Sequence, residues 1–512
     1  MKKRIIAVFA ALLLAFSALP LTLESQPTAK AAEDRESILK VCNWEDYIDE
    51  SLLEDFEAYY YEKTGKRVTV EYSTFDTNET LLTKIETAKE DYDVVCPSEY
   101  AIQKLYEKNL LQPIPKAQME NFNNVSPYAR QQFEILAPGT ADSVYAIGYC
   151  WGTLGVLYNK EKVEEVTGGE PFGWDVLWNP AFSNKILMKD SVRDSVVAAA
   201  IYAHREELSS ITDPEAYNAR LFEIINPETE KDMLPIQDAL ISQKTDVGVF
   251  YEVDDGKGDM VIGTYYLNLA WSGDAWWAID EAAAGGVTLD YAVPTEGGNV
   301  WFDGWCIPKY AKNVDAAVAF MDFLNSGDAA IRNMDATGYI SVVATPETLE
   351  YHMGLGEDYP EYAEEMDVSY FFTEGNYEIN GEAVDTSSVT VNRVMLADKS
   401  SIDRCAIMNN FKDYKAAMNM WNTVKGDTLS PLAMALILGA IFGIIAGAIA
   451  YRVVKDKRQK ARRRAVKERQ AKEMQLERAE KLKEREEKLT KAQTVAREKE
   501  TAKQAETGKE DS

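Results

Sequence analysis

The hydrophobic positions of residues 38–148 follow two different periods. Short apolar runs with the composition of strands alternate with amphipathic segments whose apolar positions recur at the helical spacing. In chain order, with strand and helix alternating, these segments are 38–42, 51–64, 67–72, 79–89, 92–96 and 101–111. Strands that alternate with helices in this way predict an α/β domain with a mostly parallel sheet.

The same rhythm continues toward the C-terminus. The predicted strands are 154–158, 185–188, 245–251 and 288–293, and the predicted helices are 315–325 and 412–424. Roughly 400 residues of this kind exceed one small hydrophobic core, so the pattern predicts two lobes.

Two longer apolar runs stand near the ends of the chain. The first, residues 5–21, follows the basic residues 2–4 and precedes the small-residue sequence Ala29-Lys30-Ala31. A charged start, an apolar run and a small-residue cleavage site are typical of a secretory signal peptide, here residues 1–31. The alternative is that this run stays uncleaved as a membrane anchor.

The second apolar run, residues 431–454, begins with about 20 uncharged residues, which matches the hydrocarbon core of a membrane. The Lys/Arg-rich residues after it belong on the cytoplasmic side. We therefore predict a single-pass cell-membrane protein with a transmembrane helix at 431–454, an extracytoplasmic N-terminal domain and a basic, helical cytoplasmic tail at 455–512. The tail is predicted as a solvated helix beside anionic lipid, with coiled-coil pairing as the alternative.

Three glycines of the second run, Gly439, Gly443 and Gly447, are spaced four residues apart. This spacing favours close contact with another membrane helix, either a second copy or a permease. The Gly and Ala content usual in membrane helices explains it equally well.

The charge of the chain is strongly acidic, with a formal net charge of −29. Residues 32–430 hold 70 Asp and Glu against 30 Lys and Arg. Such a field repels nucleic acid and attracts cations, so we expect no nucleic-acid partner. The solubility of an exported protein also explains this charge, so it supports a cationic ligand only in part.

The five cysteines are odd in number, and most lie within apolar runs. We therefore expect buried free thiols rather than a disulfide framework.

Motifs of enzymes are missing from the sequence. It contains no C-x-x-C, H-E-x-x-H or Walker sequence, and no G-x-G-x-x-G after a predicted strand. Only two histidines, His204 and His352, could serve a catalytic triad, and we expect both on helix or loop surfaces. These absences predict a protein that is not an enzyme and holds no metal or cofactor.

Aromatic side chains stand beside carboxylates after several predicted strands. The segments are 43–47, 97–100, 271–274 and 301–303. Ligands of open α/β sheets bind at the carboxyl ends of strands. A protonated amine needs a carboxylate to offset its lost hydration and gains from aromatic faces, so carboxylates at both ends of an aromatic slot would select a diamine by its length. Taken singly, an aromatic residue at such a place is usually explained by core packing and an Asp by helix capping.

The residues 43–47, 92–98, 301–303 and 337–339 resemble the signature segments of spermidine/putrescine-binding proteins of ABC transporters. The resemblance extends from about Ile38 to Lys425. It implies a two-lobed periplasmic-binding-protein fold of type II that closes about a hinge. It also implies that residues 32–148 and 304–343 form one lobe and residues 149–303 and 344–427 the other.

The resemblance also implies roles for individual residues. The aromatic residues expected to form a box around the ligand are Trp44, Tyr100, Trp271, Trp301 and Tyr339, and Tyr47 is also expected to bind the ligand. Ser98 would form hydrogen bonds at the mouth of the site. Asp303 resembles the central ammonium-binding aspartate of the family, and Asp274 resembles the second ammonium-binding aspartate of putrescine-type members.

The sequence departs from the family at three positions. Ser191 replaces one acid of an acidic pair that spermidine-type members carry, and Asp194 is shorter than the usual glutamate. Glu45 stands where many members have Ser or Thr, so it either adds a carboxylate to the site or points to solvent. The match at Asp274 and the replacement of an acidic residue by Ser191 favour putrescine over spermidine.

These features together predict a membrane-anchored receptor that delivers a polyamine to the permease and ATPase of an ABC transporter. Two alternatives stay open. One is a sensor of polyamines or other small cations that signals through the transmembrane helix and tail. The other is a binding protein for another cationic solute, such as thiamine or an amino acid.

Overall fold

A computed structural model describes residues 35–253, 255–373, 377–426 and 452. The predicted signal peptide 1–31 and tail 455–512 lie outside these residues, as does the predicted transmembrane helix 431–454 except for Arg452. In the part of the chain that is described, no helix is both long and apolar enough to cross a membrane.

A parallel sheet begins the described fold. Its central strand β1 (Ile38–Trp44) pairs with β2 (Thr69–Phe75) on one side and β3 (Val94–Val95) on the other. The helix α2 (Ser51–Thr64) connects the first two strands and has the predicted bounds. It ends at Gly65, whose φ of 72° is a left-handed conformation that glycine adopts without strain. The predicted α/β rhythm of this region is confirmed.

A second sheet is built around the long strand β7 (Ile147–Asn159). Its main order is β19-β12-β7-β10-β8-β9, and β11 and β14 also pair with β7. These strands are β8 (Ile186–Lys189), β9 (Phe250–Glu252), β10 (Leu267–Trp271), β11 (Leu289–Ala292), β12 (Gly298–Trp305), β14 (Ile340–Ser341) and β19 (Cys405–Ala406). The sheet is mixed rather than mostly parallel, because β10, β11, β12 and β14 all run antiparallel to β7.

The remaining elements surround these two sheets. The helices are α3 (Asn78–Thr83), α4 (Glu99–Glu107), α5 (Pro127–Leu136), α6 (Lys160–Thr167), α7 (Val192–Ser209), α8 (Pro214–Ile225), α9 (Glu230–Ser242), α10 (Gly256–Val261), α11 (Ser272–Ala283), α12 (Val314–Leu324), α13 (Gly327–Thr337), α14 (Pro346–Asp358), α15 (Lys399–Ile402) and α16 (Tyr414–Gly426). The short strands are β4 (Leu111–Gln112), β5 (Ile114–Pro115), β6 (Ser143–Val144), β13 (Ile307–Pro308), β15 (Ala363–Met366), β16 (Glu378–Ile379), β17 (Glu382–Ala383) and β18 (Val389–Asn392).

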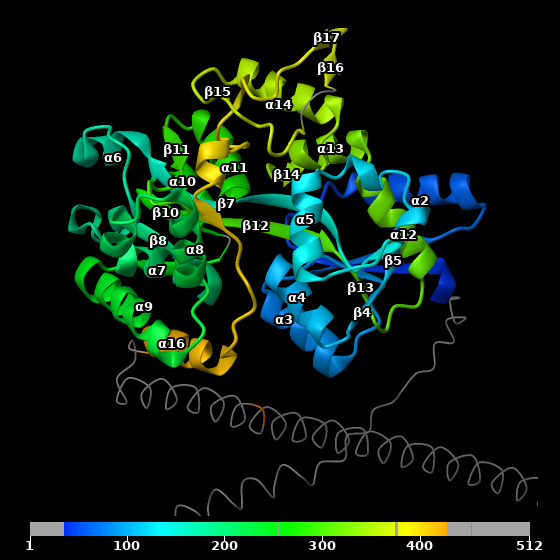
Figure 1. Cartoon of the computed structure of the whole chain (residues 1–512), viewed down its shortest axis with the longest axis horizontal. Coiled ribbons are helices and arrows are strands. Elements are labelled where there is room, and N and C mark those ends of the chain that lie inside the picture. The colour runs from blue at the N-terminus through cyan, green and yellow to red at the C-terminus, as the bar shows by residue number, and fades with distance from the viewer. Residues whose placement is uncertain (1–34, 254, 374–376, 427–451, 453–512) are drawn as a thin grey trace, which may run out of the picture. The chain divides into compact units, whose positions relative to one another are not determined.

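The strands β7 and β12 run side by side between two groups of helices (Figure 1). Helices α6 to α10 gather on the left of this view, and α2 to α5 with α12 gather on the right. After β12 the chain bonds to the first sheet, because the amides of Val95 and Cys306 each donate to the other residue's carbonyl, at 3.0 and 2.9 Å. The predicted lobe boundaries 148/149 and 303/304 fall inside β7 and β12, and the boundaries stay predictions.

Two expectations about local structure are wrong. Residues 245–251 do not form one strand, because the helical turn that continues α9 extends to Val247 and β9 starts only at Phe250. Gln243 anchors that turn from within, since its Nε2 donates to the Leu177 carbonyl at 2.9 Å. His352 is buried on α14 rather than on a surface, and burial lowers its pKa to about 3.

The cysteines agree with the expectation of buried free thiols. Cys42, Cys96, Cys150 and Cys306 are buried and Cys405 is half-buried, and all five are free. Aromatic rings fill much of the surrounding core. Phe302, fully buried on β12, stacks on Trp151 of β7 with ring centroids 5.9 Å apart.

We predict that Phe302→Ala lowers the free energy of unfolding by about 3–5 kcal/mol, because it opens a cavity where neighbouring rings cannot collapse. Phe250→Ala is the matched control, since Phe250 also lies on a strand but is 47% exposed. Denaturant unfolding of both variants checks this, and losses of similar size would contradict the packing described for Phe302.

Candidate functional site

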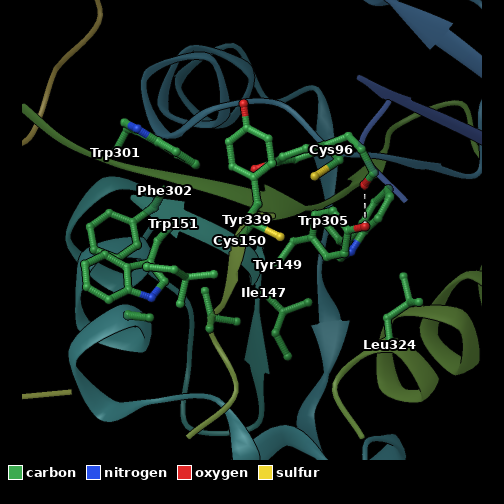
Figure 2. Close-up of a cluster of buried hydrophobic side chains, with 14 of the residues drawn as sticks. Cys96, Ile147, Tyr149, Cys150, Trp151, Trp301, Phe302, Trp305, Leu324 and Tyr339 are labelled. Carbon is green, nitrogen blue, oxygen red and sulfur yellow. Dashed lines mark hydrogen bonds between the residues drawn. The ribbon is translucent and has the colours of Figure 1, made fainter. Parts of the chain in front are cut away.

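The strand β12 places Trp301 and Asp303 on one face and Phe302 on the other, because side chains alternate along a strand. Figure 2 shows Trp301 on one side of the strand and Phe302 beside Trp151 on the other. Gly152 of β7 lies opposite Trp301, and a Cβ there would stand 2.6 Å from the indole Cζ2. The missing side chain therefore makes room for Trp301.

Asp303 is a buried carboxylate with an incomplete set of partners. The Tyr47 hydroxyl donates to its Oδ2 at 2.9 Å, and its Oδ1 has no hydrogen-bond partner among the described residues. Burial raises the pKa of Asp303 to about 7, although the hydroxyls of Ser98 and Tyr47 partly offset this rise. A buried carboxylate of this kind favours a cation next to it.

Tyr47 connects Asp303 to further aromatic residues. Its ring lies edge-on to Tyr339, with centroids 4.7 Å apart, and to Tyr149, at 5.4 Å. The Tyr149 hydroxyl also donates to the backbone carbonyl of Tyr47 at 2.6 Å. The ring centroids of Trp301 and Tyr339 lie 5.7 Å apart, so the predicted residues Tyr47, Tyr339 and Trp301 form one aromatic cluster, together with Tyr149, which was not predicted.

Ser98 and Tyr100 are held by a residue that the sequence did not indicate. The Nδ2 of Asn78 donates to the Ser98 hydroxyl at 3.0 Å and to the Tyr100 hydroxyl at 2.9 Å. The Ser98 amide donates back to Asn78 Oδ1 at 3.1 Å. Ser98 also forms a backbone bridge with Asp303, so these predicted residues do come together.

Asp274 lies in the first turn of α11 and is buried, but it is already paired. Lys189 Nζ lies 3.2 Å from its Oδ2, and Lys257 Nζ lies 3.3 Å from its Oδ1. The Tyr339 hydroxyl also donates to Oδ1 at 2.8 Å. Burial disfavours the charged form, but the two ammonium charges outweigh it, so the pKa of Asp274 lies below its usual value.

Asp194 and Trp271 contact each other directly. The Trp271 Nε1 donates to Asp194 Oδ1 at 3.0 Å, and burial raises the pKa of this carboxyl. Ser191, the cap of α7, accepts a hydrogen bond from the Asp194 amide at 3.4 Å. Ser191 thus fixes the start of the helix that carries Asp194.

Two predicted residues lie apart from this network. Trp44 is half-buried and packs on Phe75, with ring centroids 4.4 Å apart. Glu45 is exposed. Of the two expectations for Glu45, the structure agrees with the one in which it faces solvent.

Four charged residues near these side chains were not predicted as site residues. They are Lys189, Lys257, Glu99 and Arg193. Burial, and next the charge of Asp303, raise the pKa of Glu99 to about 8. Arg193 lies between the rings of Tyr100 and Phe411, 4.3 and 3.5 Å from their centroids, and burial lowers its pKa to about 10. The sequence offered one signal for Lys189, because a lysine that ends an otherwise apolar strand, as in β8, needs a partner when it is buried.

The chemistry of this network is that of cation recognition. Buried carboxylates, aromatic faces and hydroxyls surround Asp303. Within the described residues, no cluster of His, Cys, Asp and Glu could hold a metal ion.

Comparisons with known proteins point in the same direction. The model of a family described as bacterial extracellular solute-binding protein matches residues 51–352. The spermidine/putrescine-binding periplasmic protein of Salmonella typhimurium is 29% identical over 314 residues, which cover 61% of this chain and 79% of that protein. The putrescine-binding periplasmic protein of Escherichia coli is 27% identical over 327 residues, covering 62% and 80%.

Solved structures show the same fold. The spermidine/putrescine ABC transporter substrate-binding protein of Streptococcus pneumoniae aligns with a TM-score of 0.54 and 26% identity, covering 76% of this chain and 98% of that one. A similar protein of Listeria monocytogenes gives the same TM-score and identity, with 97% of its chain covered. The two-lobed α/β binding-protein fold expected from the sequence is thereby confirmed.

We predict that the stability of the ligand-free chain falls as pH rises from about 4 to 7 because of Asp303. Its folded pKa of about 7 lies above the unfolded value near 4, so in this window the folded chain holds a proton that the unfolded chain has lost. Asp303→Asn should remove the part of the decrease in stability with pH that comes from Asp303.

The measurement is the melting temperature between pH 5 and 8. Glu99→Gln is a matched comparison. Because the pKa of Glu99 is about 8, its contribution to the pH dependence of stability extends to higher pH than that of Asp303. A profile of Asp303→Asn parallel to that of the unmodified chain would rule out the raised pKa.

Proposed function

This chain belongs to the bacterial extracellular solute-binding protein family, and we propose that it is an extracytoplasmic polyamine receptor of an ABC transporter. The family is one of solute-binding proteins of transporters, not of enzymes. In this proposal the receptor takes up putrescine or a related polyamine outside the cell and delivers it to a permease with its ATPase. The relatives named for spermidine and putrescine support the ligand class.

The observation that carries the proposal is the buried carboxylate of Asp303, whose Oδ1 has no hydrogen-bond partner in the described part of the chain. A ligand ammonium beside this oxygen would replace lost hydration by a charged hydrogen bond. The nearby rings of Tyr47, Trp301 and Tyr339 would add cation–π attraction of about 0.5–2 kcal/mol each and cover the methylene chain.

The pKa of Asp303 makes the proposed binding depend on pH. An ammonium favours the ionised carboxylate, whereas near pH 7 the free protein holds a proton there part of the time. Ligand binding at pH 7 would therefore release part of a proton. Closure of two lobes around the ligand, as in other hinged binding proteins, would complete its removal from water.

We expect calorimetric titration of the full-length chain to show binding of putrescine and spermidine. Asp303→Asn should weaken it by at least about tenfold, because the variant keeps the shape of the side chain but leaves a buried ammonium without a countercharge. Asp142→Asn, in an exposed loop, is the matched control and should change the affinity by less than about twofold.

Two results would contradict the proposal. Absence of binding by every polyamine would remove the ligand claim. Unchanged affinity in Asp303→Asn would remove the role of this carboxylate while leaving the ligand class intact.

We also propose that residues 431–454 anchor the receptor beside its permease, with residues 455–512 in the cytoplasm. The apolar composition of this run and the basic residues after it support the anchor. The glycines Gly439, Gly443 and Gly447 would offer a face for another membrane helix.

Deletions in the C-terminal region test the anchor. Removing residues 431–512 should release the protein from the membrane fraction, and removing only 456–512 should not, because the apolar run carries the membrane affinity. Cell fractionation with detection of the N-terminal domain measures both. Membrane retention of the longer deletion would show that these residues are not the anchor.

A further inference from the structure

Lys189 is a fully buried ammonium in the candidate site, with a relative exposure of 2%. It ends β8, and its Nζ has three kinds of partner. The Val253 carbonyl accepts a hydrogen bond at 2.6 Å, Asp274 Oδ2 lies at 3.2 Å, and the centroid of the Trp271 ring lies at 3.9 Å.

A carboxylate, a carbonyl and an aromatic face are the groups that recognise the ammonium of an amine ligand. At Asp274 the chain thus provides its own cation. Lys257 supplies a second one at 3.3 Å, and the Tyr339 hydroxyl donates to the same carboxylate at 2.8 Å. A ligand ammonium placed here would meet two like charges in a buried environment, where charge repulsion is least screened.

Asp303 presents the opposite situation. It forms no ion pair within the described part of the chain, and its Oδ1 has no hydrogen-bond partner there. The two carboxylates that resemble ammonium-binding groups are therefore unequal. Asp303 has no countercharge among the described residues, whereas Asp274 is neutralised by lysines of the protein itself.

We infer that Lys189 determines the specificity of the site by occupying the position of a second ligand ammonium, so that the preferred ligand is an amine with one ammonium group and an uncharged far end. This inference rests on the proposed polyamine receptor function. The single ammonium binds at Asp303, and the far end faces Lys189 and Asp274. An acylated amine fits this chemistry, because its amide oxygen accepts from an ammonium and its amide N–H donates to a carboxylate.

The test compares putrescine with N-acetylputrescine, which has the same carbon chain and one cationic end. By calorimetric titration of the full-length chain, N-acetylputrescine should bind at least about tenfold more tightly than putrescine, since specificity here comes from a repulsive contact. This comparison needs no variant, so it decides the inference even if a substitution at Lys189 prevents folding.

Lys189→Met should shift the preference toward putrescine, because it removes the more deeply buried of the two cations at Asp274 and leaves its Oδ2 for the ligand. The gain for putrescine should be about tenfold or more. The double variant Lys189→Met/Asp274→Asn should lose this gain, because it no longer offers a carboxylate. Lys185→Met is the matched control, since Lys185 lies just before β8, where its Nζ donates to the Thr264 carbonyl at 2.9 Å and lies 5.1 Å from the centroid of the Tyr266 ring.

The outcomes separate the two proposals. Equal or tighter binding of putrescine by the unmodified chain, with no change in Lys189→Met, overturns the role of Lys189 and leaves the polyamine receptor standing. In that case the second ammonium pairs elsewhere, for example with Asp194. Failure of the unmodified chain to bind either amine overturns the inference about Lys189, and failure to bind spermidine as well overturns both proposals.

Discussion

The burial of carboxylates is the constraint on which the candidate site depends. Asp194, Asp274, Asp303 and Glu99 are all nearly inaccessible to water. An ionised carboxylate in such surroundings must be paired, be hydrogen-bonded or take up a proton. The structure combines these solutions: lysines pair with Asp274, an indole N–H donates to Asp194, and burial raises the pKa values of Asp194, Asp303 and Glu99. These choices decide where the site can still accept a positive charge.

The side chains that meet at Asp303 are held by regular elements rather than by loops alone. The pairing of β12 with β7 fixes Trp301 and Asp303, and the start of α11 fixes Asp274. Gly273 of α11 leaves space for Tyr339, whose ring atoms would lie within 2.6 Å of a Cβ at that position. Aromatic rings therefore approach the backbone closely enough to exclude water from the carboxylates.

Sequence reasoning identified the parts of this site that depend on local pattern. Aromatic residues beside carboxylates marked Trp271, Asp274, Trp301 and Asp303, although Trp301 and Asp303 lie within β12 rather than after a strand. The helical period fixed the bounds of α2. It missed what depends on distant partners. Lys189 meets Asp274 across 85 residues, and nothing in the local sequence of either one indicates the other. The burial of His352 and the mixed direction of the second sheet escaped for the same reason, since both are set by tertiary packing.

The pairing of β7 with β12 has a consequence for how the chain folds. It joins residues 147–159 to residues 298–305, and the hydrogen bond from Tyr47 to Asp303 spans 256 residues. Closing such long loops is entropically unfavourable, and proteins dominated by distant contacts fold slowly. Asp303 gains its neighbours only after the start and the middle of the chain have met. Occupancy of the site by an amine would therefore report that folding is complete, because no short fragment of the chain contains the whole set of contacts.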